Sequence, residues 1–245
     1  MRILLLGGTG EARALAERLH PDVDIVNSLA GRVPDPALPV GPVRIGGFGG
    51  VDGLCSWLTD NDVTAVVDAT HPFAATITAN AARACAELGV PHVLLSRPAW
   101  GTAGATEVDT DTDAADVVAA QAYSRVFLTT GRSGIGAFRD SDAWFLIRVV
   151  TPPDPETLPR RHRLLLSRGP YRYEGEHALM SEHGIQAVVT KNSGGAMTRA
   201  KLDAAQALGA DVVMIRRPLP PAGVSVVGSV DDAEAWVLSL GSAAG

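Results

Sequence analysis

Several turns rich in glycine and polar residues follow apolar segments of this chain, and each could help to bind an anionic ligand. The first, Gly7 to Gly10, lies between the apolar run Arg2–Leu6 and a helical pattern. Glycines allow the backbone to approach a ligand closely, and the following helix would direct free N–H groups toward a phosphate. The third glycine of a complete dinucleotide fingerprint is missing, because Ala12 or Arg13 stands in that register. This turn predicts a nucleotide phosphate site, with a glycine turn used only for packing as the alternative.

The segment NSLAGR follows the second apolar run, where dinucleotide-binding sheets select between NAD and NADP. Enzymes that use NAD carry an acidic residue there for the ribose hydroxyl, whereas an arginine accommodates the 2′-phosphate of NADP. Asn27 and Ser28 replace the acid, and Arg32 follows Gly31. We therefore expect NADPH to be preferred. The alternative is that these are ordinary turn residues beside a solvated arginine.

Two further turns of the first half carry an aromatic ring and a histidine. Gly47 and Phe48 belong to RIGGFGGVDGL, which could lie flat against a ligand or serve only as a connector. Thr70 and His71 precede Pro72, which suits the first position of a helix capped by either residue. His71 is the one candidate catalytic residue, since histidine moves protons near neutral pH, and a cap without chemistry is the alternative. No motif identifies the proton donor, for which solvent is also a candidate.

The second half of the chain carries cations at comparable places. The turn VVTKNSGG places Lys191, Asn192 and Ser193 before two glycines, where a lysine could bind an anion or simply be solvated. Arg132 in TGR and Arg168 in SRGPY stand nearest to expected strand ends. They would suit a substrate with several carboxylates, because a planar guanidinium binds each carboxylate bidentately.

An internal repeat organises the elements that must position these turns. Residues 70–98 align without a gap to residues 190–218, at a constant offset of 120 from Thr70 to Thr190. The shared Gly and Arg-Pro positions favour a true repeat over a chance match of two alanine-rich helices. Apolar strands alternate with helices, which is typical of mainly parallel sheets whose ligands bind at the carboxyl ends of strands. We expect an α/β fold of two similar Rossmann-like domains, 1–122 and 123–245, with the active site in the cleft between them.

The expected elements can be given by residue range. Strands are expected near 2–6, 23–27, 43–45, 63–67, 92–95, 126–129, 144–149, 163–166, 186–190 and 211–215. Helices are expected near 11–19, 51–59, 72–88, 112–121, 174–183, 197–208 and 230–240. The proline-rich segment 151–159 is expected to be a surface loop.

Composition excludes several classes of protein. The formal net charge of −6 argues against non-specific binding of nucleic acid, which requires a basic face. Cys55 and Cys85 are far apart in apolar surroundings, so neither a disulfide framework nor a metal site is expected. No apolar run approaches the roughly 20 residues of a membrane span, and the strand pattern begins at Met1 without room for a signal peptide. We expect a cytoplasmic protein; its oligomeric state is left open, with a monomer plausible.

Taken in order, the motifs GGTGEA, SLAGR, GGFGG, DATHPFA, RPAW, TGR, RGP, TKNSGG and AKLDAA closely resemble the precorrin-6A reductase family of cobalamin biosynthesis. The resemblance covers almost the entire chain. It implies an NADPH-dependent oxidoreductase that reduces a double bond of the tetrapyrrole precorrin-6A, giving precorrin-6B. It also implies that the first domain binds NADPH and that the second closes over cofactor and substrate.

The resemblance assigns roles to the turn residues. The implied NADPH contacts are Gly8, Thr9, Gly10, Ser28, Gly31, Arg32, Gly47, Phe48, Thr70, His71, Lys191, Asn192 and Ser193. The substrate carboxylates would be bound by Arg132, Arg168 and Lys191. Three alternatives stay open: a cobalt-precorrin-6A reductase of the anaerobic route, a tetrapyrrole-assembly enzyme without cofactor, and a two-lobed small-molecule binding protein.

Overall fold

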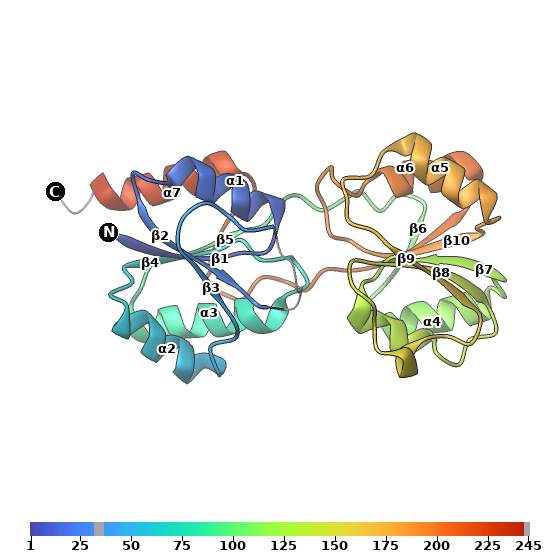
Figure 1. Ribbon diagram of the computed structural model, residues 1–245, viewed down its shortest axis with the longest axis horizontal. Coiled ribbons are helices and arrows are strands. Elements are labelled where there is room, and N and C mark those ends of the chain that lie inside the picture. The colour runs from blue at the N-terminus through green and yellow to red at the C-terminus, as the bar shows by residue number, and fades with distance from the viewer. Residues whose placement is uncertain (32–36, 243–245) are drawn as a thin grey trace. The chain divides into compact units, whose positions relative to one another are not determined.

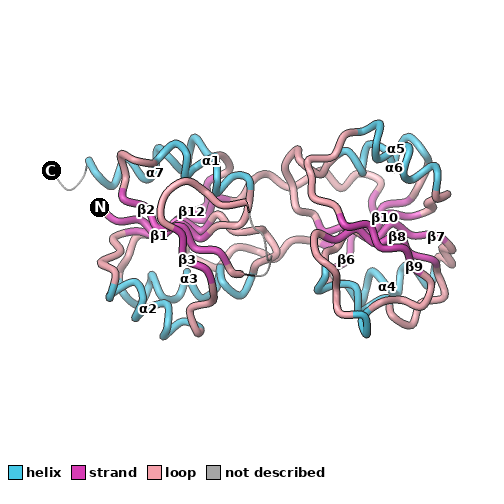
Figure 2. Tube along the Cα trace, viewed as in Figure 1, coloured by secondary structure: helices cyan, strands magenta, loops and turns pink. Residues whose placement is uncertain are grey.

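The computed structural model describes residues 1–31 and 37–242, which form two compact units. Unit 1 comprises Met1–Pro98 and Pro218–Gly245, and unit 2 comprises Ala99–Arg217. Each unit holds one six-stranded sheet with helices on both faces (Figures 1 and 2). All described strand pairs are parallel. The expected α/β fold with parallel sheets is confirmed.

Unit 1 has the strand order β12-β5-β4-β1-β2-β3. Helices α1 and α7 cover one face of its sheet, and α2 and α3 cover the other (Figure 1). Its elements are β1 (Arg2–Leu6), α1 (Gly10–Leu19), β2 (Asp24–Leu29), β3 (Val43–Ile45), α2 (Gly50–Asp60), β4 (Ala65–Asp68), α3 (Ala75–Leu88), β5 (His92–Leu95), β12 (Ser225–Val227) and α7 (Val230–Ser242).

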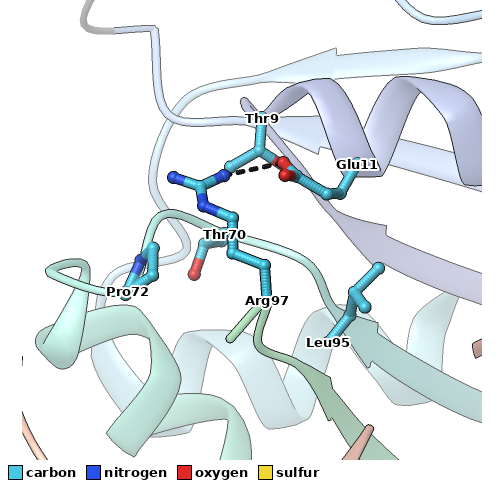
Figure 3. A pocket seen from close by; sticks show the side chains of 6 residues that line it. All are labelled: Thr9, Glu11, Thr70, Pro72, Leu95 and Arg97. Atoms are coloured by element: carbon cyan, nitrogen blue, oxygen red, sulfur yellow. Dashed lines mark hydrogen bonds and ion pairs between the residues drawn. The ribbon is translucent and has the colours of Figure 1, made fainter. Parts of the chain in front are cut away.

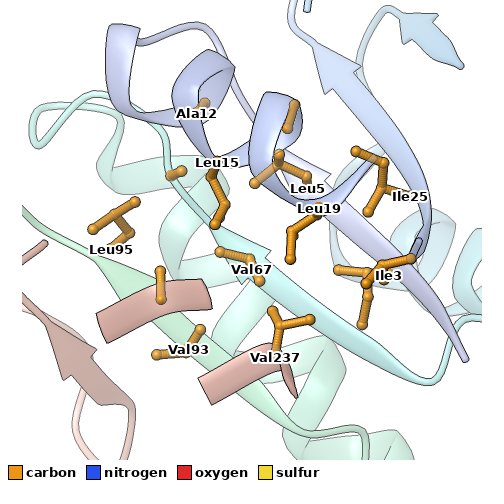
Figure 4. Packing of buried hydrophobic residues seen from close by; sticks show 14 of the residues in the cluster. Ile3, Leu5, Ala12, Leu15, Leu19, Ile25, Val67, Val93, Leu95 and Val237 are labelled. Atoms are coloured by element: carbon orange, nitrogen blue, oxygen red, sulfur yellow. The ribbon is translucent and has the colours of Figure 1, made fainter. Parts of the chain in front are cut away.

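The apolar run of β1 is explained by burial of the strand on both faces. Ile3 and Leu5 pack in the cluster beneath α1 and α7 (Figure 4), whereas Leu4 and Leu6 pack beneath α2 and α3. Side chains alternate between the faces of a strand, so a central strand covered on both sides needs apolar residues throughout. This burial fixes the position of the carboxyl end of β1, at which the glycine turn begins.

Unit 2 has the strand order β6-β11-β10-β7-β8-β9. Helices α5 and α6 cover one face of its sheet and α4 lies on the other (Figure 1), with Phe127, Leu146 and Val188 in the cluster beneath α5 and α6. Its elements are β6 (Ala105–Val108), α4 (Asp111–Ala120), β7 (Arg125–Leu128), the 3-10 helix η1 (Arg132–Phe138), β8 (Trp144–Val149), the 3-10 helix η2 (Pro155–Thr157), β9 (His162–Leu166), α5 (Tyr173–Glu182), β10 (Ala187–Lys191), α6 (Ala200–Leu208) and β11 (Asp211–Ile215).

The repeat seen in the sequence is also a structural repeat. The segment β4-α3-β5 corresponds to β10-α6-β11, and both helices end on a glycine in the same left-handed conformation, with φ of 66° and ψ of 23° at Gly89 and Gly209. A residue with a side chain is strained at this φ, whereas glycine adopts it readily. The glycine shared by the two copies is therefore required by the helix end.

The compact units differ from the expected domains 1–122 and 123–245. Strand β6 pairs with β11 in the sheet of unit 2, whereas β12 pairs with β5 in the sheet of unit 1. The chain therefore passes from one unit to the other twice, once after Pro98 and once after Arg217. The two short strands lie where the sequence pattern predicts loops. The pattern therefore places each following helix, α4 and α7, with the preceding half of the chain.

Candidate functional site

The glycine turn after β1 leads directly into the first turn of α1. Gly8 has a φ of +111°, and a Cβ atom placed there would meet no other atom within 4 Å. The Thr9 hydroxyl accepts a hydrogen bond from Ala12 N (3.1 Å) and donates one to Ala69 O (2.7 Å). Thr9 thus caps α1 and ties the turn to the end of β4, while the backbone at Gly8 stays accessible. This combination of a fixed helix N-terminus and an open glycine suits a phosphate group.

A shallow pocket brings together the ends of β1, β4 and β5 (Figure 3). Its lining residues are Thr9, Glu11, Thr70, Pro72, Leu95 and Arg97. Within it, Arg97 Nη1 lies 2.7 Å from Glu11 Oε2, and both side chains are largely buried. Neither Arg97 nor Glu11 is among the site residues that the sequence motifs predict. The signal for Arg97 was the Arg-Pro position that both copies of the repeat share.

The turn after β4 differs from the expected helix start. Helix α3 begins at Ala75 and has Ala74 as its N-cap, without a side-chain hydrogen bond, so neither Thr70 nor His71 caps it. The Thr70 hydroxyl instead donates to Asp68 Oδ1 (2.6 Å), and the next residues form a tight turn in which Ala74 N donates to His71 O (2.7 Å). Asp68 is fully buried, and its Oδ2 has no hydrogen-bond partner. The exposed His71 accepts a hydrogen bond at Nδ1 from Phe73 N (3.2 Å).

Arg44, which no sequence pattern predicts as a site residue, joins β2 to the turn after β3. Ser28 is opposite Arg44 in the strand pairing, and Arg44 Nη1 donates to Ser28 Oγ (2.9 Å). The same guanidinium donates to Gly46 O and Gly47 O, both at 3.0 Å. Its centre lies 3.7 Å from the centroid of the Phe48 ring. Burial lowers the pKa of Arg44, because the guanidinium loses part of its hydration.

Three other residues near these turns are predicted to contact NADPH: Gly31, Phe48 and Arg32. Gly31 adopts a φ of +72°, with Ile45 Cγ2 only 3.1 Å from the place that a Cβ would take, so a larger residue would be strained there. Phe48 packs edge-on against Trp57, with ring centroids 5.6 Å apart. Arg32, the predicted contact of a 2′-phosphate, lies outside the described residues.

In unit 2, the turn after β10 is held by a network of polar contacts. Lys191 Nζ lies 3.5 Å from Asp111 Oδ2, and both side chains are mostly buried. Asn192 and Trp100 form a reciprocal pair, in which Trp100 N donates to Asn192 Oδ1 (2.9 Å) and Asn192 Nδ2 donates to Trp100 O (3.1 Å). Ser193 follows, and its N donates to Lys191 O (2.7 Å). Lys191, Asn192 and Ser193 thus form an ordered turn, with the lysine beside a carboxylate.

The two arginines expected to bind substrate lie at strand ends of unit 2. Arg132 is exposed at the start of η1, just after β7, and Arg168 is exposed two residues after β9. Their exposure leaves the guanidinium groups accessible to an anionic ligand.

A buried charged cluster lies near the turn after β10. Lys201 Nζ donates to Thr198 O (2.8 Å) and stands 4.5 Å from the centroid of the Trp100 ring. Arg148 and Glu176 form a buried ion pair with 2.6 Å between Nη2 and Oε2. Burial, followed by repulsion from Arg148, lowers the pKa of Lys201 to about 7. Lys201 is not among the residues that the sequence motifs predict for a site, although it replaces Ala81 of the first copy of the repeat.

Among the described residues, no three histidine, cysteine or acidic side chains are grouped as metal ligands, and no helix is long and apolar enough to cross a membrane. Cys55 and Cys85 are free thiols, and burial raises the pKa of Cys85 to about 12.

Comparisons with known proteins agree with the motifs. Residues 2–238 match the family described as precorrin-6x reductase CbiJ/CobK. A precorrin-6A reductase of Mycobacterium tuberculosis is 68% identical over 241 residues, covering 98% of this chain and 99% of the relative. A cobalt-precorrin-6A reductase of Priestia megaterium is 32% identical over 234 residues, covering 88% and 90%.

A solved structure titled CobK precorrin-6A reductase superimposes with a TM-score of 0.89 at 40% sequence identity, covering 98% of this chain and 96% of that one. The family match spans both units and includes every turn described above. The chain therefore belongs to the precorrin-6x reductase family.

Proposed function

We propose that this protein reduces precorrin-6A to precorrin-6B, with NADPH as the hydride donor. Family membership supports the reaction and weighs against a cofactor-free assembly enzyme or a non-catalytic binding protein. The observation that carries the choice of a dinucleotide is the open glycine turn at Gly8, directly before the capped N-terminus of α1.

The residues of unit 1 fit a phosphorylated dinucleotide. A pyrophosphate would approach the backbone at Gly8 and Gly10, where the positive end of the α1 dipole and the first N–H groups of the helix stabilise negative charge. Strand β2 ends in Asn27, Ser28 and Leu29, so the strand end carries no acid that would accept a hydrogen bond from a ribose 2′-hydroxyl. These features support NADPH over NADH.

Positioning is the main catalytic contribution that we assign to this chain. When bound, NADPH would supply the hydride for one carbon of the macrocycle double bond, and the neighbouring carbon would take a proton. Thr9 and Thr70 line the pocket at the ends of β1 and β4, where they would orient the dinucleotide. His71 can donate a hydrogen bond from Nε2, because its Nδ1 already accepts one from Phe73 N. We assign His71 a cofactor contact and leave proton delivery to solvent.

The substrate is assigned to the cationic turns of unit 2. Precorrin-6A carries several carboxylates, and the exposed Arg132 and Arg168 offer guanidinium groups that bind carboxylates bidentately. Lys191 adds a third cation, whose position is fixed by Asp111. We propose that these three residues bind substrate carboxylates.

A cobalt-free substrate is favoured by the relatives. The protein named for precorrin-6A is far more similar to this chain than the one named for cobalt-precorrin-6A. We therefore propose the metal-free macrocycle as substrate. Parallel assays with the metal-free and the cobalt-containing macrocycle test this choice, which would be overturned if only the cobalt form were reduced.

The decisive experiment follows NADPH absorbance while purified protein is mixed with precorrin-6A. The expected result is one NADPH oxidised for each macrocycle reduced, with precorrin-6B identified by mass spectrometry. NADH in place of NADPH should give a much lower kcat/KM. Tight binding of precorrin-6A without any oxidation of NADPH would refute the proposed activity.

A further inference from the structure

Arg44 differs from four other arginines of unit 1 in the charge of its partners. Four others pair with carboxylates: Arg2 with Asp24, Arg18 with Asp231, Arg83 with Glu87, and Arg97 with Glu11. Arg44 is part-buried, and its hydrogen bonds end on three neutral oxygens: Ser28 Oγ, Gly46 O and Gly47 O. Its positive charge is therefore not neutralised by a carboxylate within the described residues.

An arginine held in this way is poised to bind an anion. Partial burial weakens the hydration of the guanidinium, and the group stays protonated at physiological pH. Three hydrogen bonds and the Phe48 ring, 3.7 Å from the guanidinium centre, fix its orientation before a ligand arrives. A fixed and uncompensated cation loses little conformational freedom when it binds a phosphate.

The position of Arg44 indicates which phosphate it would meet. It stands on β3 beside Ser28 of β2, next to the open backbone of Gly46 and Gly47, where no atom lies within 4 Å of an added Cβ. The end of β2 is the place at which Rossmann-like sheets bind the adenosine ribose. A 2′-phosphate on that ribose would carry its negative charge close to the Arg44 guanidinium.

We propose that Arg44 is the residue that selects NADPH over NADH, by binding the 2′-phosphate with a guanidinium held in place by Ser28 and Phe48. This inference rests on the proposed function, since it requires that unit 1 binds a dinucleotide. It assigns to Arg44 the role that the sequence analysis gave to Arg32.

The test compares the Kd values of NADPH and NADH by nicotinamide fluorescence for the wild type, Arg44→Gln and Arg32→Ala. Arg44→Gln should weaken NADPH by about 30-fold and NADH by less than about threefold, because only NADPH loses a charge-assisted contact. Arg2→Gln is the matched control: Arg2 lies at the amino end of β1 and should leave both affinities unchanged. Arg44→Lys keeps the positive charge but not the planar guanidinium that binds an anion bidentately. The Kd of NADPH should therefore rise about tenfold.

Thermal unfolding of each variant shows whether the fold is kept, and Arg44→Lys serves alone if Arg44→Gln does not fold. Equal losses of NADPH and NADH in the Arg44 variants would overturn the inference and leave Arg44 as a support for the glycine loop. The inference would also be overturned if the preference for NADPH were lost in Arg32→Ala and kept in the Arg44 variants. A wild-type protein that binds neither nucleotide would instead refute the proposed cofactor itself.

Discussion

The turns after β1 and β7 occupy equivalent positions in the two sheets, yet they build different structures. After β1, Gly8 and Thr9 lead into the ten-residue α-helix α1, which Thr9 caps. After β7, Gly131 precedes the seven-residue 3-10 helix η1, which has no side-chain cap. Only the first turn offers a capped α-helix N-terminus beside an open glycine. Of these two equivalent turns, only the one in unit 1 therefore has the features of a phosphate site.

The second difference lies in the helices that follow β4 and β10. Ala81 of α3 and Lys201 of α6 are equivalent in the repeat, and both are buried. Ala81 packs in an apolar cluster, whereas Lys201 contacts Thr198 O and the Trp100 ring. The buried position that holds an alanine in unit 1 thus holds a lysine in unit 2. This lysine lies beside the turn that we assign to the substrate.

The largest expected effect concerns this buried cation. Folded protein loses the Lys201 proton near pH 7, whereas the unfolded chain keeps it until about 10.5. Between these values the unfolded state binds more protons, so the free energy of unfolding should rise with pH by a few kcal/mol. Lys201→Met should lack this rise. Urea unfolding of both proteins at intervals from pH 6 to pH 10 gives the difference, and parallel pH profiles would contradict the assignment.

Gly8→Ala tests the proposed phosphate site of unit 1. A Cβ at this φ strains the backbone and stands where the pyrophosphate should approach, so the Kd of NADPH should rise about 100-fold. Gly131→Ala in unit 2 is the matched control, since Gly131 also has a positive φ, +80°. Thermal unfolding should show that both variants are destabilised, and isothermal titration calorimetry should show that only Gly8→Ala binds NADPH more weakly. Similar Kd values for the two variants would remove the distinction between the turns.

Lys191→Met and His71→Ala compare the turns at the carboxyl ends of β10 and β4. Loss of the Lys191 cation should raise the KM for precorrin-6A by about 30-fold and leave the Kd of NADPH nearly unchanged. His71→Ala, at the equivalent position of the repeat, should weaken NADPH by a few-fold and leave the substrate KM intact. Steady-state kinetics combined with NADPH titration separates these outcomes. A rise only in the NADPH Kd of Lys191→Met would move Lys191 to the cofactor site.

The smallest effect is expected from the helix caps. Thr9→Val removes the cap of α1, and Thr110→Val removes the capping box of α4. Each should lower the free energy of unfolding by about 1 kcal/mol. Only Thr9→Val should also weaken NADPH binding, because Thr9 holds the turn at the proposed phosphate site. Denaturant unfolding and NADPH titration of both variants measure the two quantities, and equal NADPH affinities would argue against the role of Thr9.

Much of the fold could be predicted because its signals are local. The apolar strands and the Gly stops at residues 89 and 209 depend on burial and on backbone conformation, which neighbouring residues determine. The start of α3 was missed because the Thr70 hydroxyl bonds to Asp68, a contact that competes with capping. Arg44 was missed because its partners come from β2 and from the following loop, and no local pattern marks such a meeting.

Sequence by itself determined that this chain is duplicated, that its strands are parallel and that its glycine turns stand at their carboxyl ends. Only the tertiary structure decided which unit receives the last strand and helix of each copy. Segments β6-α4 and β12-α7 are separated by the same offset of 120 residues and have the same local pattern. A short edge strand can pair with either sheet, because the backbone hydrogen bonds are the same in both. Strand β6 pairs with β11 and β12 pairs with β5, so each joins the sheet of the other half of the chain. This pairing depends on contacts between residues far apart in the chain, which the local sequence pattern does not show.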